Sequence, residues 1–330
     1  MTAIASHISE FLHERLPHQQ GASTNTCDSY SYAFQLLFKF MSDRFNLQPF
    51  ELTLEQIDAP MVMDFLLYLE VERKNSPRTR NARLVALKSF MKFIQYREPK
   101  LLEQTQRILS IPAKKTDSRL VNYLTINEMY AILDTPDLST RTGIRDRAML
   151  HLCFAAGLRV TELVSLACHS IDLRFSPSVH ILGKGRIERV LPLWKDTVTD
   201  LRSWLEVRGN TLVPELFLNV RNQAMTRSGF KYILQKHTRK ATEYCPTLEE
   251  KNISPHVLRH TSAILILQAT GDIRKVSLWL GHADIQTTEI YLRADPTEKI
   301  EAIEAIVPPS LKRGKFRVPD KLMELLNNKA

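Results

Sequence analysis

Residues 278–295 read LWLGHADIQTTEIYLRAD, a stretch in which one histidine and one tyrosine lie nine positions apart. Gly281 and His282 follow an apolar, helix-like run and mark a helix end, and Tyr291 falls two turns into the next predicted helix. Taken singly, a histidine after glycine is usually part of a helix cap. A tyrosine on an amphipathic helix usually packs in a core. A chemical role for either side chain therefore depends on what the rest of the chain brings to it.

The segment directly upstream, SPHVLRHTSAILILQATG (254–271), predicts a helix that Ser254 caps, Pro255 begins and Gly271 ends. His256 and Arg259 are three positions apart and share a face of its first turn. The free N–H groups of a helix N-terminus favour an anion, so a histidine and an arginine at this end suit a phosphate. An ordinary surface pair is the alternative.

Two further cationic residues precede this helix. Arg159 lies in AAGLRVTELVSL (155–166), with Glu162 three positions on to hold its guanidinium. A common structural ion pair is the alternative. SVHILGKGRIERVLPL (178–193) alternates in polarity and predicts a β-hairpin that turns at Gly183-Lys184-Gly185. No GxxxxGK[ST] pattern is present, so this is no P-loop, and a solvated turn lysine is the alternative.

Taken together, these residues match an ordered pattern. Their chain order resembles the tyrosine recombinase family (phage-integrase-like and Xer-like site-specific recombinases), and so do the frames GLRVTEL, GKGRIERVLPL, SPHVLRHT and WLGHADIQTTEIY. The resemblance covers 120–295, and the helical N-terminal part resembles the family's SAM-like core-binding domain. The matching residues are Arg159, Lys184, His256, Arg259, His282 and Tyr291.

The resemblance implies a site-specific recombinase of integrase or transposase type, which cuts and rejoins DNA through a covalent 3′-phosphotyrosyl intermediate. Tyr291 would be the nucleophile, exposed on a short movable helix. By the resemblance, Arg159 and Arg259 would clamp the phosphate, and His282 would donate a further hydrogen bond to it. His256 would accept the proton of the tyrosine, and Lys184 would be the general acid. No Asp/Glu/His metal cluster stands out in the sequence. Cationic side chains would therefore neutralise the negative charge that the phosphodiester gains in the transition state, and we expect no metal, cofactor or ATP requirement.

The pattern along the chain predicts a mainly α protein with two domains that clamp DNA. We expect a helical N-terminal domain over 1–107, a polar linker over 108–119 and a catalytic domain with a small β-sheet over 120–330. A tail begins at 296 within that domain. Residues 296–307 predict a short capped helix with one apolar stripe, formed by Ile300, Ile303 and Ile306.

The charge distribution favours a nucleic acid partner. The net charge is +9, and residues 73–119 alone carry thirteen basic and three acidic side chains, a net charge of +10. Such a local field attracts a polyanion, although a solvated basic helix or an acidic membrane surface are alternatives. On the helix predicted from 77, the apolar stripe is Leu84, Leu87, Met91 and Ile94, with basic residues on other faces. The candidate DNA contacts are Arg78, Arg80, Arg83 and Lys88.

Composition indicates an intracellular, cytoplasmic protein. The four cysteines are scattered without a CxxC pair. No apolar run reaches the ~18 residues of a membrane span, and the first residues lack the pattern of a secretory signal. The expected partners are double-stranded DNA and, at synapsis, three more copies of the chain or related recombinases. Two alternatives stay open: a relaxing enzyme of the type IB topoisomerase kind, and a non-catalytic DNA-binding accessory protein.

Overall fold

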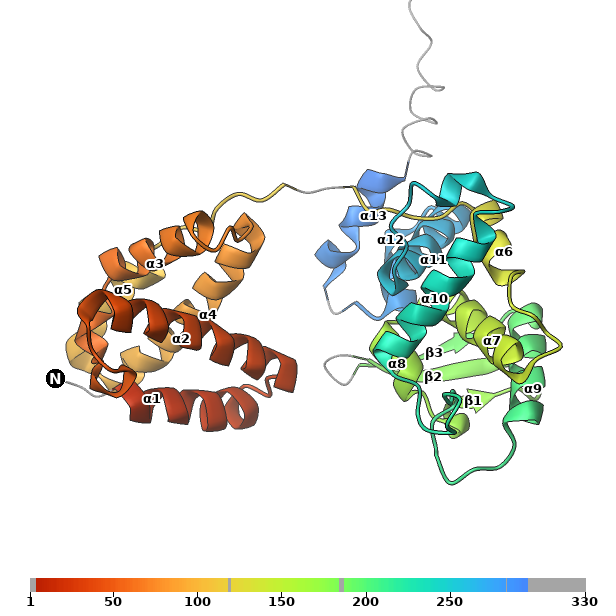
Figure 1. The fold of residues 1–330 in the computed structure, drawn as a ribbon, viewed down its shortest axis with the longest axis horizontal. Coiled ribbons are helices and arrows are strands. Elements are labelled where there is room, and N and C mark those ends of the chain that lie inside the picture. Colours follow the sequence, from red (N-terminus) through yellow and green to blue (C-terminus); the bar gives the residue numbers. More distant parts are fainter. Residues whose placement is uncertain (1–3, 118–119, 184–186, 283, 296–330) are drawn as a thin grey trace, which may run out of the picture. The chain divides into compact units, whose positions relative to one another are not determined.

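The chain forms two compact units, residues 1–118 and 119–330. The computed structural model describes residues 4–117, 120–183, 187–282 and 284–295, and Figure 1 shows its elements along the chain. The predicted tail helix over 296–307 lies outside the described residues, as does Lys184. Among the described helices, none combines the length and apolarity needed to span a lipid bilayer.

The first unit is helical throughout the part that the structure describes. Its elements are α1 (Ile4–Glu10), the π-helical segment η1 (Phe11–Gln19), α2 (Thr24–Phe45), the short 3-10 turns η2 (Pro49–Glu51) and η3 (Leu54–Gln56), α3 (Ala59–Val71), α4 (Pro77–Arg97), the turn η4 (Pro99–Leu101) and α5 (Leu102–Leu109).

Helix α4 begins as the sequence predicts. The Ser76 hydroxyl accepts a hydrogen bond from the Thr79 amide over 3.3 Å, and Pro77 occupies the first helical position. The predicted apolar stripe of α4 is buried, and it packs with residues of α1, η1, α2 and α3 in one core. Ile108 and Ile111 belong to this core too, so the chain leaves the first unit later than the predicted boundary at 107.

The second unit combines helices with one small sheet, which confirms the predicted fold class. Its elements are α6 (Ile126–Leu133), α7 (Arg141–Ala155), α8 (Val160–Ser165), the turn η5 (Cys168–Ser170), β1 (Ile171–Asp172), β2 (Ser178–Leu182), β3 (Glu188–Pro192), α9 (Lys195–Arg208), α10 (Arg227–Ala241), the turn η7 (Pro246–Leu248), α11 (Pro255–Thr270), α12 (Ile273–Leu280), the turn η8 (Ile285–Thr287) and α13 (Glu289–Ala294).

The three strands form an antiparallel sheet in the order β1-β2-β3. Strands β2 and β3 are the predicted hairpin, in which Val179 pairs with Leu191 and Ile181 with Arg189. All four of these side chains point to the buried face, as the alternation of a strand requires. An arginine therefore occupies a core position of β3.

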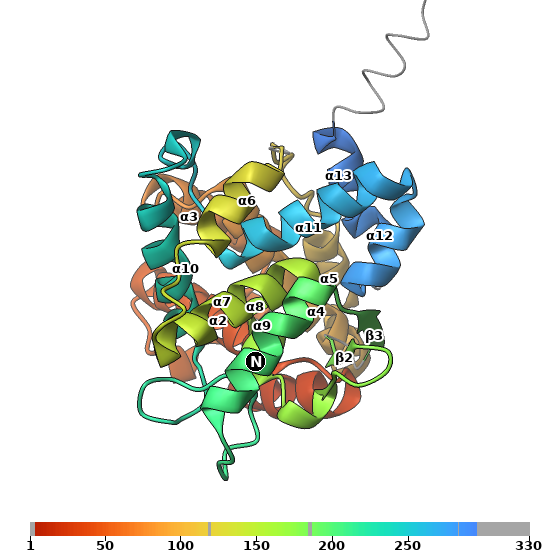
Figure 2. The ribbon, with the colours of Figure 1, turned by 90° about the vertical axis from the view of Figure 1, so that its right-hand side faces the viewer.

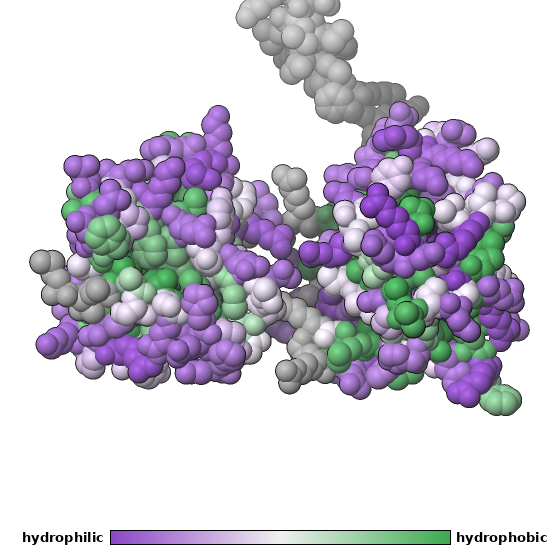
Figure 3. Space-filling model, turned by 60° about the horizontal axis from the view of Figure 1, so that its bottom comes forward, coloured by the Kyte–Doolittle hydropathy of each residue, from purple (hydrophilic) through white to green (hydrophobic). Residues whose placement is uncertain are grey.

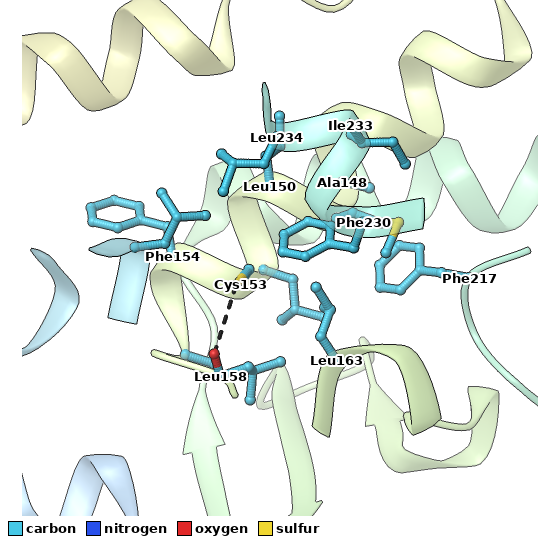
Figure 4. Packing of buried hydrophobic residues seen from close by; sticks show 14 of the residues in the cluster. Ala148, Leu150, Cys153, Phe154, Leu158, Leu163, Phe217, Phe230, Ile233 and Leu234 are labelled. Carbon is cyan, nitrogen blue, oxygen red and sulfur yellow. Dashed lines mark hydrogen bonds between the residues drawn. The ribbon is translucent and has the colours of Figure 1, made fainter. Parts of the chain in front are cut away.

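The core of the second unit surrounds α7. In Figure 4, Cys153 lies among side chains of α8 and α10, and its thiol points to the carbonyl of Leu158, 3.7 Å away. Burial raises the pKa of the Cys153 thiol to about 12, so this thiol stays protonated and unreactive. Helix α11 packs against α7, α12 and α13, and α12 also contacts β3 (Figure 2).

The surface of each unit is largely hydrophilic on the face drawn in Figure 3, and hydrophobic side chains reach that surface between the polar ones. Large hydrophobic residues that are more than two thirds exposed include Phe50 and Tyr96 in the first unit and Leu278 in the second. Leu278 lies on α12. Helix α12 borders both the candidate site and an apolar cavity.

Candidate active site

Glu162 is the centre of the candidate site. Helix α8 starts directly after Arg159, and the Glu162 carboxylate accepts the Arg159 amide over 3.0 Å and its guanidinium over 2.8 Å. This contact is both a helix cap and an ion pair. It fixes the direction of Arg159, which keeps about a quarter of its side chain exposed. The predicted Arg159–Glu162 contact is therefore present.

Arg189 binds the same carboxylate from β3. Its Nη2 lies 2.7 Å from Glu162 Oε2 and its Nη1 lies 3.4 Å from Oε1. Both side chains are buried, and Arg189 Nε has no hydrogen-bond partner among the described residues. We did not predict Arg189. The signal was available, because the alternation of β3 places this arginine on the same face as buried Leu191, where a charge requires a partner.

The cluster keeps an excess of positive charge. Burial on its own raises the pKa of Glu162. The hydrogen bonds and charge of Arg189, together with the hydrogen bonds from Arg159, outweigh burial and lower that pKa. Glu162 is therefore ionised at neutral pH. Arg259 approaches the same carboxylate to 3.9 Å. Three guanidinium groups thus face one carboxylate, which leaves two positive charges uncompensated for an anionic ligand.

Arg259 is held by backbone carbonyls. Its Nη1 donates to the carbonyl of Gly157 over 2.6 Å and its Nη2 to that of Leu280 over 2.7 Å. Burial and the neighbouring Arg159 charge lower the pKa of Arg259 to about 10, so it stays charged at neutral pH. Gly157 has a φ of +57°, and a Cβ there would lie 2.8 Å from the side chain of Leu280. Glycine at 157 therefore permits the close approach of α7 and α12 that holds Arg259.

Tyr291 is buried, which corrects the expectation of an exposed tyrosine. Its side chain on α13 is 1% exposed and packs in a small core with residues of α11 and α12, including Ile264 and Leu280. Burial raises the pKa of Tyr291 to about 12, although the charges of Arg259 and Arg159 act in the opposite direction. The phenol oxygen lies 3.0 Å from Nδ1 of His260.

The structure distinguishes the three histidines. His260, which we did not predict, contacts Tyr291, whereas His256 is exposed on the first turn of α11. His282 Nδ1 lies 2.8 Å from the Thr288 hydroxyl. Burial and then nearby positive charges lower the pKa of both His260 and His282 to about 4, so both rings are neutral at neutral pH. Ser254, the predicted cap of α11, makes no side-chain cap bond.

Lys184 lies outside the described residues, but the base of its hairpin is described. The Gly183 amide donates to the carbonyl of Ile187 over 2.8 Å and closes the two strands. A Cβ on Gly183 would lie 3.2 Å from Nη1 of Arg189. Gly183, the last described residue before Lys184, therefore lies next to the arginine cluster.

The four candidate DNA contacts in the first unit differ in how far their side chains are exposed and in whether they already bind groups of the same unit. Arg78 is exposed on α4, whereas Arg80 is 4% exposed and donates to the carbonyl of Pro112 over 3.2 Å. Arg80 therefore does not lie on a free basic face. It precedes Leu84 by four positions and continues the buried stripe. Lys88 donates a hydrogen bond to the carbonyl of Ile111 over 2.5 Å. Arg83 donates a hydrogen bond to the carbonyl of Ser29, and its guanidinium lies over the ring of Tyr32.

An apolar cavity of about 560 Å³ lies beside the site. Strand β3 and helices α11 and α12 form its walls, and Arg189 separates it from the charged cluster. Most of its wall is hydrocarbon. Its larger side chains are Phe154, Trp194, Leu265, Ile266, Leu278 and Trp279.

Two protein-family models match the chain. The one described as the phage integrase family covers residues 122–298, which include the whole arginine cluster and Tyr291. The one described as the phage integrase SAM-like domain covers residues 6–94 of the helical first unit.

Curated relatives match over nearly the full chain. The "Putative integrase/recombinase y4rC" of Sinorhizobium fredii is 39% identical over 99% of this chain and 98% of its own. The tyrosine recombinase XerD of Listeria innocua is 33% identical over 86% of this chain and 92% of its own. A solved structure of the XerH site-specific recombinase bound to palindromic difH substrate has a TM-score of 0.66 at 24% identity, over 86% of this chain and 81% of that one. The XerH likeness supports the fold.

Proposed function

Because the chain belongs to the phage integrase family and is a tyrosine recombinase, we propose that the cluster around Glu162 cuts and rejoins DNA through a bond between Tyr291 and a DNA 3′-phosphate. The function of the chain is site-specific DNA recombination, and the chain is a DNA strand transferase. The observation that supports these residues most strongly is the set of three guanidinium groups around one carboxylate. The charges of two of them, Arg259 and Arg159, also act on Tyr291.

The arginines stabilise the phosphate during strand transfer. A phosphodiester gains negative charge as the nucleophile adds, and preorganised donors are most effective where that charge develops. Arg159 and Arg259 bind the scissile phosphate, and His282 donates a further hydrogen bond. Removal of one such donor typically costs ~10²–10³ in rate. Since the cluster supplies its charge through fixed cations, the reaction needs no metal ion.

Strand cleavage exchanges one phosphate ester for another. The Tyr291 oxygen forms a bond to phosphorus while the bond from phosphorus to the 5′-oxygen breaks. His256 takes the phenol proton, and Lys184 gives a proton to the departing 5′-oxygen. The phosphotyrosyl ester conserves the bond, so the reverse steps rejoin a 5′-hydroxyl without ATP.

Cleavage requires Tyr291 to leave its buried position. A phenol with a pKa of about 12 is a weak nucleophile at neutral pH, and a buried oxygen does not reach a phosphate in a DNA backbone. Outside the core, the same oxygen would lose the burial that raises its pKa and keep the arginines that lower it. Movement of α13 and ionisation of Tyr291 are therefore one coupled step.

DNA and other recombinase subunits are the partners. Exposed basic residues of the first unit, Arg78 and Lys92 on α4, contact phosphates of double-stranded DNA. A solved lambda integrase tetramer is bound to a Holliday junction, and its likeness to this chain is one of fold alone. We place this chain in a similar assembly of four subunits, as a homotetramer or with related recombinases. We expect the tail after residue 295, which lies outside the described residues, to act between these subunits.

The test is trapping of the covalent intermediate. A binding site is first selected from a randomised duplex library with the Tyr291→Phe chain, which cannot bond to DNA. A nick near the cleavage point lets the short cut fragment diffuse away, so an adduct accumulates. The wild-type chain should form an adduct that survives a denaturing gel, and Tyr291→Phe should bind the same DNA and form none. An adduct from Tyr291→Phe would exclude this tyrosine as the nucleophile.

A further inference from the structure

The contact between Tyr291 and His260 is a hydrogen bond between helices α13 and α11. Helix α13 has six residues and is too short to be stable alone, so its position depends on the side chains that it buries. Tyr291 is such a side chain, and His260 meets it from α11 with ring centroids 5.6 Å apart. A second tie joins Gln268 of α11 to Asp295 at the end of α13 over 3.2 Å.

The hydrogen bond satisfies a hydroxyl that water does not reach. Tyr291 is 1% exposed, and its hydroxyl lies 3.0 Å from Nδ1 of His260. In the neutral ring, Nδ1 without a proton accepts the phenol O–H. An unsatisfied buried hydroxyl is costly, so loss of this acceptor favours conformations in which Tyr291 faces water.

The same contact does not activate the phenol. The pKa of His260 is about 4 and that of Tyr291 about 12, so the proton stays on the tyrosine in this arrangement. Proton transfer between these groups is uphill by many orders of magnitude. The contact therefore stabilises the neutral, inward form of the nucleophile.

We propose that His260 is a positioning residue that latches Tyr291 in an inactive, inward position, and that breaking the Tyr291–His260 hydrogen bond is a required step before cleavage. This proposal rests on the proposed role of Tyr291 as nucleophile and adds a built-in restraint on it. Subunits in which the latch is closed do not cleave. The fraction of open subunits then limits how much DNA is cut at one time.

The experiment compares three single variants of the full chain. His260→Leu removes the acceptor and keeps an apolar side chain of similar size. His260→Asn keeps a polar atom near the place of Nδ1 but has no basic nitrogen. Gln268→Met, the matched control, removes the other tie between α11 and α13 and leaves the acceptor for Tyr291.

Two readouts follow the latch. Without DNA, tetranitromethane nitrates accessible tyrosines, and peptide mass spectrometry measures the rate at Tyr291 against exposed Tyr96 and Tyr244 of the same molecule. This readout does not depend on the proposed function. With DNA, the rate of adduct formation on the nicked site is measured at saturating protein.

With a latch, His260→Leu should raise nitration of Tyr291 and the adduct rate by about tenfold each, the effect of losing one buried hydrogen-bond partner. His260→Asn and Gln268→Met should both stay much closer to wild type than to His260→Leu. If His260 is instead the general base, His260→Leu and His260→Asn should both lower the adduct rate by ~10² or more, and the latch is wrong.

Equal effects of Gln268→Met and His260→Leu would also overturn the proposal, because general loosening of α13 would then explain both. So would unchanged nitration of Tyr291 in His260→Leu. Should His260→Leu fail to fold, His260→Gln takes its place, since it moves the polar atom away from the position of Nδ1. If wild type forms no adduct while nitration follows the latch pattern, the proposed function fails and the latch stands.

Discussion

Arg189 and Glu162 form a buried ion pair that joins strand β3 to helix α8, with Arg189 Nη2 2.7 Å from Glu162 Oε2. The pair connects the hairpin that carries Lys184 to the helix that Arg159 precedes. A single carboxylate thereby positions residues from two separate segments of the chain. The arrangement makes Glu162 and Arg189 as important for the site as the residues proposed to bind phosphate.

Replacing Arg189 with leucine should destabilise the second unit by about 3 kcal/mol, because it removes the strongest partner of a buried carboxylate. The measurement is urea unfolding followed by tryptophan fluorescence. All three tryptophans lie in the second unit, so the signal reports that unit alone. Arg174→Leu is the matched control. Its pair with Asp172 is exposed to solvent, so its loss should change the free energy of unfolding far less than the loss of Arg189. Equal losses for the two variants would contradict the buried-pair interpretation.

Lys184→Ala should cleave the selected site slowly and recover on DNA whose leaving 5′-oxygen is replaced by sulfur. A thiolate departs without a proton, so the general acid becomes unnecessary. The readout is the adduct rate on matched oxygen and sulfur substrates. Arg159→Ala is the control, because loss of a phosphate contact should impair both substrates alike. If Lys184→Ala is impaired equally on both, another residue supplies the proton.

The sequence was sufficient for residues that follow local rules. Ser76 caps α4, the stripe of α4 is buried, and the hairpin pairs as its alternation predicts. Arg159 and Glu162 meet because they are three positions apart at a helix start. Each of these outcomes depends on short-range geometry that periodicity and capping preferences describe.

The missed residues depend on long-range packing. His256 and His260 are one helical turn apart on α11, so spacing alone could not tell which of them contacts Tyr291. That contact depends on the return of α13, which brings Tyr291 to His260, 31 residues earlier in the chain. Burial of Tyr291 follows from the same return of the chain. The burial of Arg80 was missed for a different reason, since its four-residue spacing from Leu84 already placed it on the apolar stripe.

Acidification from about pH 6.5 towards pH 4 should destabilise the second unit through His260 and His282. Burial lowers the pKa of each imidazole from 6.5 to about 4 in the folded chain, whereas the unfolded chain takes up these protons near 6.5. The unfolded state therefore binds more protons in this window, and the free energy of unfolding falls as pH falls. The double variant His260→Asn, His282→Asn should show a flatter dependence by tryptophan-detected urea unfolding. An identical slope in the wild-type chain and the double variant would contradict the assignment.

Neutralising Arg78 and Lys92 should weaken DNA binding and reduce its salt dependence. Both side chains are exposed on α4, and each lost phosphate contact lowers the slope of log affinity against log salt by about 0.9, or about 1.8 for both. The measurement is a binding titration at several salt concentrations. Lys100→Ala with Arg107→Ala removes the same charge from other exposed positions of the first unit and should change the slope less. Equal slopes for the two double variants would place the phosphates elsewhere.

The tail should act between subunits. The predicted stripe Ile300, Ile303 and Ile306 lies outside the described residues, and a helix of the predicted length would be too short to fold alone, so we expect the stripe to require an apolar surface. The cavity between β3, α11 and α12 offers one, with Leu278 76% exposed at its wall. Passed from each subunit to the next, this contact closes a ring of four.

Two variants separate docking onto a neighbour from docking within one chain. Ile300→Asp with Ile303→Asp removes the apolar stripe, and Leu278→Asp places a charge in the cavity wall. Each should leave folding by circular dichroism and single-site gel shifts unchanged, while the complex of two paired sites fails to form by sizing. Trp194 and Trp279 line the cavity, so their fluorescence reports its occupation. A signal in free wild-type protein that is independent of concentration and lost in the tail variant would show docking within one chain. Paired complexes at wild-type concentration in either variant would exclude this contact from synapsis.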